Sequence, residues 1–209
     1  MTALVRPCGE VWGTAGFGVS RQANWQQASR AGVEAGRMGE ILTAKVLDQL
    51  CLQPGGPTVI HDVRIPLKGI NANIDHVLVA GDRILLIDSK CWKPGVYWTL
   101  FGQTRRGTQR FLPAEKKTMQ MARQGIDGML RGAGARLQLA TPLLVVWPSN
   151  HSGSFTPLHL QVPGARTVAG PSLERVARRF AGHGDNRPSP LALGRLLALA
   201  NDPQVKVAV

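Results

Sequence analysis

Two strand-like runs separated by Gly81 and Asp82 constrain this chain more than any other feature of its sequence. The runs Ile74–Ala80 and Arg83–Lys90 are rich in Val, Ile and Leu, and glycine in the first central position is typical of a type II′ turn. A two-residue turn at this point pairs positions whose numbers add to 163, and a four-residue loop about the same centre keeps that register. The sequence therefore predicts an antiparallel hairpin of defined register.

This register places unusual side chains opposite each other. Asp75 falls opposite Asp88, and Asn73 falls opposite Lys90, all on one face of the sheet. Two like charges in directly paired positions destabilise a sheet, so a compensating charge is expected. Two interpretations stay open at this point. One is a hard divalent cation bound by carboxylate oxygens, and the other is a salt bridge between Lys90 and one aspartate.

The rest of the chain predicts helices and further strands around this hairpin. After a segment of 25 residues without a clear period, in which one short helix is expected near Gln22–Arg30, the pattern indicates a single α/β or α+β domain. The expected helices are Ala31–Leu52, Glu115–Leu130, Ser172–Ala181 and Pro190–Ala200. The expected further strands are Thr58–Ile65, Leu143–Trp147, Val162–Val168, and a hairpin of Trp92–Leu100 with Gln109–Leu112 around Gln103–Gly107.

Two of the expected helices carry a one-sided apolar pattern. In Ala31–Leu52 the apolar side chains recur at steps of three and four residues. They are Met38, Ile41, Leu42, Val46 (or Lys45) and Leu50. In Glu115–Leu130 the apolar face is formed by Met119, Ala122, Ile126 and Met129, and the opposite polar face includes Lys116, Gln120, Arg123 and Gln124. Each apolar face is expected to pack on the sheet.

Charge and cysteine content narrow the class of protein. Of 209 residues, 25 are Lys or Arg and 13 are Asp or Glu, which gives a net charge of +12 and favours a polyanionic partner such as nucleic acid. With 44% hydrophobic residues, wholesale disorder is excluded. No run reaches the ~18 apolar residues of a membrane span, and no apolar leader is visible, so we expect a cytoplasmic protein without membrane contact. Cys8, Cys51 and Cys91 are too scattered for a disulfide framework or a CxxC zinc site.

An ordered set of motifs resembles the NERD (nuclease-related) domain of the PD-(D/E)xK nuclease superfamily. The set is Gly36-Arg-Met-Gly-Glu40, then Ile74-Asp-His-Val-Leu-Val79, then Leu85-Leu-Ile-Asp-Ser-Lys90 followed by Trp92. The resemblance covers roughly residues 31–200, with element order alone after residue 131. It implies a restriction-endonuclease-like core with a central mixed sheet flanked by helices. We accordingly expect residues 1–30 to form an irregular arm and residues 31–209 to form a single nuclease-like domain.

The resemblance implies roles for individual residues. Asp75 resembles the first metal-binding acid, Asp88 the second acid, and Lys90 the lysine of the D-x-K motif. Glu40 resembles the helical glutamate that completes the metal shell, and Gln120 the glutamine of the helix after the sheet. The family more often has Glu-Thr-Lys where this chain has Asp-Ser-Lys, and the Asn-Pro that usually precedes the glutamine is missing, which leaves Gln124 as a rival.

The expected function is metal-dependent hydrolysis of a phosphodiester bond, with Mg²⁺ or Mn²⁺ as cofactor. The superfamily implies DNA rather than RNA, and no base-reading element is visible. Basic residues expected to contact phosphates are Arg105, Arg106, Arg110, Lys116 and Arg123. His76 alternates to the opposite face from Asp75 and is expected to pack behind the site. A catalytically silent nucleic-acid-binding or assembly module on the same fold is the alternative, and a homodimer or a helicase-type partner stays open.

Overall fold

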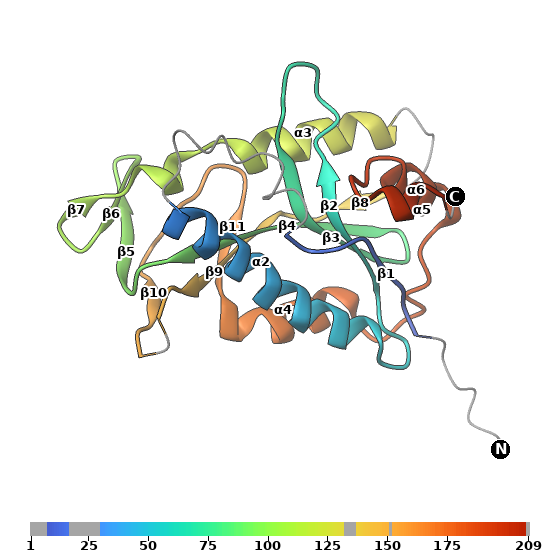
Figure 1. The fold of residues 1–209 in the computed structure, drawn as a ribbon, viewed down its shortest axis with the longest axis horizontal. Coiled ribbons are helices and arrows are strands. Elements are labelled where there is room, and N and C mark those ends of the chain that lie inside the picture. The colour runs from blue at the N-terminus through green and yellow to red at the C-terminus, as the bar shows by residue number, and fades with distance from the viewer. Residues whose placement is uncertain (1–7, 17–29, 132–136, 151, 208–209) are drawn as a thin grey trace.

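The computed structural model describes residues 8–16, 30–131, 137–150 and 152–207, and shows a mixed sheet with helices on both faces (Figure 1). This arrangement confirms the predicted fold class. The helices are α2 (Arg30–Cys51), α3 (Thr118–Arg131), α4 (Leu173–Ala181), α5 (Pro190–Leu197) and α6 (Pro203–Val207), with 3₁₀ turns η1 (Leu112–Glu115) and η2 (Gly170–Ser172). The strands are β1 (Val11–Trp12), β2 (Thr58–Arg64), β3 (Asn73–Ala80), β4 (Arg83–Trp92), β5 (Gly95–Leu100), β6 (Gln103–Arg106), β7 (Gln109–Arg110), β8 (Gln138–Leu139), β9 (Leu143–Pro148), β10 (Phe155–Pro157) and β11 (Arg166–Ala169).

The main sheet is built outward from the predicted hairpin. Its strand order is β1-β2-β3-β4-β9-β11, with β8 also paired to β4. The β2–β3 and β3–β4 pairs are antiparallel, and β1, β9 and β11 each join in parallel. His76 pairs with Ile87 and Val77 with Leu86, which confirms the predicted register. Gly81 has φ +60°, as the first position of a type II′ turn requires.

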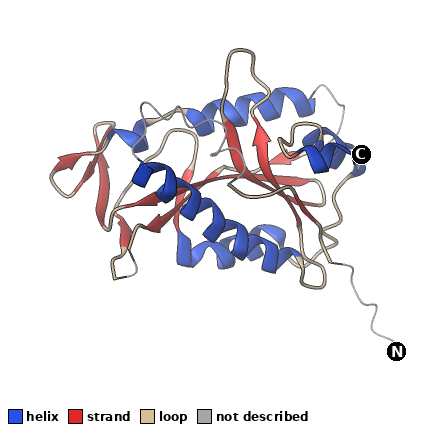
Figure 2. Ribbon diagram, viewed as in Figure 1, coloured by secondary structure: helices blue, strands red, loops and turns tan. Residues whose placement is uncertain are grey.

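Each face of the sheet has its own apolar core, as strand alternation demands. On one face, hairpin residues such as Val77 and Leu86 pack against α3 and α5. On the other face, Leu78 and Ile87 pack against α2 and α4, the helices drawn below the sheet in Figure 2. Strand β9 contributes to both faces, which confirms that it is buried on both sides.

Helix α2 forms where it was expected, but its buried face differs from the predicted one. Met38 and Ile41 are 52% and 42% exposed, whereas Thr43 and Leu47 are fully buried. The reason is a close approach of helix and strand at Gly39. A Cβ added there would lie 3.0 Å from the backbone carbon of Lys90, so only glycine lets the helix pack at this distance.

A second, smaller sheet has the order β10-β5-β6-β7 and projects from one end of the main sheet (Figure 1). The single predicted hairpin around residues 103–107 is wrong, because Gln103–Arg106 is itself a strand between two tight turns. The predicted strand Val162–Val168 begins only at Arg166, since Gly164 has φ +75° and turns the chain first.

Four short elements were not predicted at all, because two to five residues show no readable period: β1, β8, β10 and α6. Most of the helix expected near 22–30 lies outside the described residues. Within the described ranges, none of the helices has the length and apolarity needed to cross a bilayer.

Candidate active site

A cavity of about 350 Å³ opens beside the end of the β3–β4 hairpin that lies away from its turn. Its charged and amide lining comes from α2, β2, β3, β4 and the segment before α3, and comprises Glu40, Asp62, Asn73, Asp75, Asp88, Lys90 and Lys116. Its remaining wall comprises Ala72, Trp92, Pro113, Thr118, Met119, Leu144 and Val162. The cavity thus collects acids from four different elements together with two lysines.

The two hairpin aspartates are held by different partners. The Asp75 Oδ2 atom accepts a hydrogen bond from the backbone N–H of Ser89 at 2.6 Å. The Lys90 ammonium lies 2.7 Å from Asp88 Oδ2 and also donates to the Ser89 carbonyl at 3.1 Å. The salt bridge that the sequence left open is therefore present, but it involves Asp88 only.

The acids of the cavity are crowded enough to resist full ionisation. Burial, together with the charges of Asp62 and Asp88, raises the pKa of Glu40 to about 7, although Lys90 acts in the opposite direction. Burial and then the Asp88 charge raise the pKa of Asp75 well above its usual value. Burial alone would lower the pKa of Lys90, but the surrounding carboxylates raise it, so this side chain stays charged. The carboxylates of the cavity thus outnumber the positively charged side chains that could neutralise them.

Asp62 is a member of the cluster that the sequence did not reveal. Its Oδ1 atom accepts hydrogen bonds from Asn73 at 2.7 Å and Asn201 at 3.2 Å. It has φ +54° within β2, and the β2–β3 ladder omits the Asp62 and Asp75 positions although the register is the same on both sides. A non-glycine residue in this conformation is strained, which is common at functional sites. An aspartate in a strand whose neighbours include the buried Ile60 and Val63 was the available signal.

Residues 35–127 match the family described as nuclease-related domain (NERD). This segment contains Glu40, the complete hairpin and the first turns of α3, and so nearly all of the cavity lining. The resemblance drawn from the motifs is confirmed, and the mixed sheet flanked by helices is consistent with a nuclease-like fold. No significant match to a curated protein or to a solved structure was found.

Not every predicted site residue reaches the cavity. Gln120 and Gln124 are exposed on α3 and do not line it, whereas their neighbours Thr118 and Met119 do. The backbone of Gln120 instead packs closely against Gly164, where an added Cβ would lie 2.7 Å away. A helix turns by about 100° per residue, so the burial of Met119 leaves Gln120 on the exposed side of α3.

The predicted phosphate contacts are spread over two places. Lys116 lines the cavity, while Arg123 is exposed on α3 away from it. The other three lie in the small sheet. Arg110 pairs with Glu115 at 3.2 Å, and the guanidinium of Arg105 stands 5.8 Å from the ring centre of Trp98. These arginines form an arm beside the cavity rather than part of its lining.

Behind the hairpin aspartates, a chain of polar side chains crosses the opposite face of the sheet. Asp48 Oδ1 lies 3.0 Å from His61 Nε2, the two histidine Nδ1 atoms are 2.7 Å apart, and His76 Nε2 lies 3.1 Å from Ser89 Oγ. Burial and the nearby His61 and Lys90 hold the pKa of His76 well below its usual value, so it is neutral. The expectation that His76 lies behind the site is confirmed, and the participation of His61 was missed.

The oxygen donors of the cavity suit a hard cation but are not arranged as a finished metal site. Within the described ranges, no three His, Cys, Asp or Glu side chains converge as metal ligands. The hairpin accounts for this, because Asp75 is bonded to Ser89 and Asp88 to Lys90. Carboxylate oxygens with raised pKa values nevertheless match Mg²⁺ in chemistry and charge, and this ion retains several waters and needs few protein ligands.

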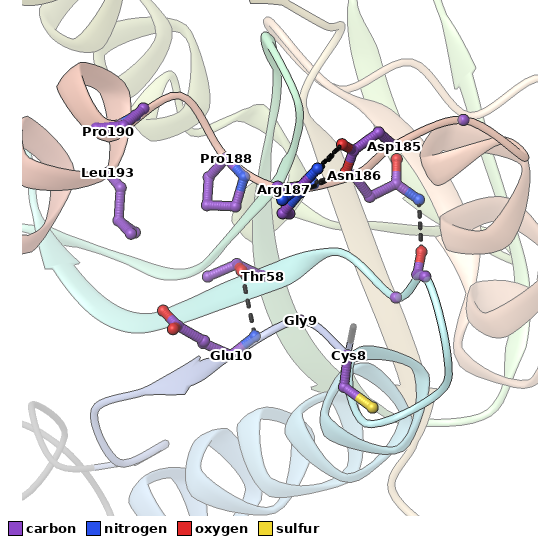
Figure 3. Close-up of a pocket in the computed structure, with 13 residues that line it drawn as sticks. Cys8, Gly9, Glu10, Thr58, Asp185, Asn186, Arg187, Pro188, Pro190 and Leu193 are labelled. Carbon is purple, nitrogen blue, oxygen red and sulfur yellow. Dashed lines mark hydrogen bonds and ion pairs between the residues drawn. The ribbon is translucent and has the colours of Figure 1, made fainter. Parts of the chain in front are cut away.

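A cavity of about 630 Å³ at the other end of the hairpin has a different character (Figure 3). It lies between the glycines before β2 and the loop before α5. Its charged groups pair with each other, since Arg187 bonds Asp185 at 2.8 Å, and the Asn186 side chain donates to the Gly55 carbonyl at 2.8 Å. Acids do not cluster here, so the smaller cavity is the better candidate for chemistry.

Proposed function

We propose that this protein hydrolyses phosphodiester bonds of nucleic acid with the help of a divalent metal ion. The observation that supports the proposal most directly is the convergence of Glu40, Asp75, Asp88 and Lys90 on one cavity within a nuclease-related domain. These side chains come from positions 40, 75, 88 and 90, and only the fold brings them together. Their roles follow from their environments.

The acidic side chains would bind the metal. Asp75 and Asp88 provide the hairpin oxygens, and Glu40 faces them from α2. When bound, Mg²⁺ or Mn²⁺ supplies Lewis acidity that activates water and neutralises charge on the phosphate. The charge shortage of the cluster supports this assignment, because an added cation would favour the ionised forms of Asp75 and Glu40, whose pKa values are raised.

Lys90 and Glu40 contribute chemistry of their own. The Lys90 ammonium, charged at every working pH, can donate a hydrogen bond to the phosphate oxygen on which negative charge develops. Glu40, with a pKa of about 7, can take up or release a proton on its carboxylate in the neutral range. Both side chains line the same cavity, so they can serve one phosphate group.

The basic residues suggest how a substrate would lie. Lys116 on the cavity wall and the arginines of the small sheet offer contacts to the backbone on one side of the scissile bond. Contacts of this type do not read sequence, so we propose cleavage with little sequence preference. The superfamily resemblance favours DNA over RNA.

The test is a cleavage assay on supercoiled, linear and single-stranded DNA with Mg²⁺ or Mn²⁺, beside EDTA. Asp88→Asn and Lys90→Met should each reduce cleavage at least about 100-fold, since each removes a charge that acts on the transition state. Asp127→Asn is the matched control, because Asp127 is an acid paired with Arg131 outside the cavity. Cleavage that survives EDTA, or that falls equally in the control, would contradict the proposal.

A catalytically silent nucleic-acid-binding module is the second candidate. It is favoured by the closed Lys90–Asp88 ion pair and by the lack of a ready three-ligand cluster in the described residues. In that case the wild-type protein and both cavity variants would bind DNA equally and cleave none of it. Stabilisation of the fold by Mg²⁺ that is lost in Asp88→Asn would speak against this module.

A further inference from the structure

The turn between β5 and β6 carries a residue that does not suit it. Leu100 and Gln103 form the last pair of the ladder, so Phe101 and Gly102 make a two-residue turn. Their φ angles are +47° and +74°, as in a type I′ turn. Asn, Asp or Gly is preferred at both positions, and a bulky side chain is strained there because its Cβ approaches the following carbonyl.

Within the described structure, the side chain of Phe101 makes no packing contacts that would offset this strain. The side chain of Phe101 is 95% exposed and belongs to none of the apolar clusters. The other phenylalanines in the described ranges behave differently: Phe111 and Phe155 pack around Trp92, and Phe180 of α4 packs against the apolar core beneath that helix. A large apolar side chain that is both strained and exposed points to a partner outside the chain.

The turn is fixed rather than loose, and it stands beside the candidate active site. The Thr99 hydroxyl accepts a hydrogen bond from the backbone N–H of Gln161 at 3.0 Å. On the neighbouring strand, the Thr104 N–H donates to Glu115 Oε1 at 3.1 Å. Gln161 and Glu115 directly precede Val162 and Lys116 in the chain, and both of these line the cavity. Hydrogen bonds thus connect the strands on both sides of the turn to two segments that contribute to the cavity wall.

The surroundings of Phe101 identify the chemistry of the partner. The same small sheet carries Arg105, whose guanidinium lies over Trp98, together with Arg106 and Arg110. An exposed aromatic ring on the same small sheet as several guanidinium groups is the combination that binds unpaired bases by stacking and nearby phosphates by charge.

We propose that Phe101 stacks on an unpaired base of the nucleic acid whose phosphodiester lies in the cavity. The inference rests on the proposed function and specifies its substrate class as nucleic acid that is single-stranded or locally unpaired next to the cleavage site. The turn acts as a wedge: its strain is retained because Asn or Gly at this position would leave no ring to stack.

The experiment measures binding and stability separately from cleavage. A single-stranded oligonucleotide containing 2-aminopurine is titrated with the wild-type protein, Phe101→Asn and Phe101→Trp in EDTA, and a fully paired duplex is titrated in parallel. Leu52→Asn is the control, since Leu52 is another exposed apolar residue, 64% exposed, just beyond the end of α2.

We expect Phe101→Asn to weaken single-strand binding about 5- to 100-fold and to remove the fluorescence change, with little effect on the duplex. The same variant should melt a few degrees higher than the wild-type protein, because Asn-Gly suits the turn. Phe101→Trp should retain binding, and Leu52→Asn should match the wild type.

Equal single-strand affinities for the wild-type protein and Phe101→Asn would overturn the inference, and the proposed hydrolysis would stand if the wild-type protein still cleaves DNA with Mg²⁺. Loss of binding in Phe101→Asn with no cleavage by the wild-type protein would support the inference and reject hydrolysis. Unchanged oligonucleotide binding combined with lost sedimentation on phosphatidylglycerol vesicles would overturn the inference in favour of a lipid surface.

Discussion

Both faces of the β3–β4 hairpin carry polar residues at the same level along the strands. On one face these residues are bonded to one another, and on the other face they are crowded carboxylates. On one face, His76 and Ser89 belong to a buried hydrogen-bonded chain that runs to Asp48 through His61. On the other face, one residue earlier on each strand, carboxylates outnumber the cations that could neutralise them, and the pKa of Asp75 is raised. The histidine face is satisfied internally, whereas the acidic face is not.

This contrast separates structure from function on a single pair of strands. A fully bonded polar chain contributes to stability and orients the backbone of Ser89, whose N–H in turn bonds Asp75. A group of crowded carboxylates costs stability and is retained when an external ligand compensates it. Mutations on the acidic face should therefore reduce cleavage without reducing stability, and mutations on the histidine face should reduce stability with little effect on cleavage. The following experiments test this contrast.

The largest effect is expected from Asp75→Asn. The substitution removes a charge from the crowded face and keeps the shape, so cleavage should fall at least about 100-fold. The melting temperature at pH 8 should stay the same or rise, because less like charge is confined. Thermal melting and an Mg²⁺-dependent cleavage assay measure the two effects. A variant that melts much lower would show that the acidic face also holds the fold together.

His76→Phe should have the reverse signature. It removes the partner of His61 Nδ1 and of the Ser89 hydroxyl in the buried face, which should lower the free energy of unfolding by about 2–4 kcal/mol. Urea unfolding followed by fluorescence measures this change. Cleavage per folded molecule should remain within a few-fold of the wild type at low temperature. A His76→Phe variant that is stable but inactive would show that His76 is needed for cleavage rather than for stability.

Glu40→Gln tests the acidic face through pH. The pKa of Glu40 is about 7 in the folded chain against 4.5 ordinarily, so the folded state binds more protons than the unfolded state between these values. The stability associated with the protonated group is present below pH 4.5 and is lost as pH rises through 7. Relative to the wild type, Glu40→Gln should become more stable from pH 5 to 8, by at most about 3 kcal/mol.

Chemical denaturation at intervals of half a pH unit follows this difference. Saturating Mg²⁺ should reduce it, because a bound cation favours ionised Glu40. A difference between variant and wild type that is flat over the whole range would contradict the crowding of carboxylates in the cavity.

Asp48→Asn should give the smallest effect. Asp48 lies at the solvent end of the histidine chain, with its side chain 36% exposed, and asparagine keeps an oxygen that can accept from His61. We expect a loss below about 1 kcal/mol in urea unfolding, because water can replace part of an exposed hydrogen bond. A loss as large as that of His76→Phe would mean that the charge of Asp48 fixes the whole chain.

The hairpin could be predicted from the sequence because its rules are local. A turn centre and strand alternation are enough to place Asp75, Asp88 and Lys90 on one face and His76 on the other. These rules depend on neighbours in the chain, so the prediction needed no knowledge of packing. The register and the ion pair of Lys90 are the parts of the site that followed most directly.

The parts that failed depend on how separate elements meet. The rotation of α2 that exposes Met38 is set by its contact with β4, and Gln120 is excluded because the burial of Met119 leaves it on the exposed side of α3. Asp62 joins the cavity through a left-handed backbone conformation that no residue pattern encodes. The alternation of side chains along the strand would not by itself have identified Asp62 as a fourth acid of the cavity.

The contact at Gly39 has a consequence for how long the candidate site exists. Because the helix bearing Glu40 rests directly on the backbone of Lys90, the acids cannot separate unless helix and strand part. Since α2 and β4 share one buried apolar core, we expect hydrogen exchange at the amides of this contact to follow opening of the central sheet. We therefore expect the site not to unfold locally by itself, and its folded geometry to last as long as the sheet stays closed.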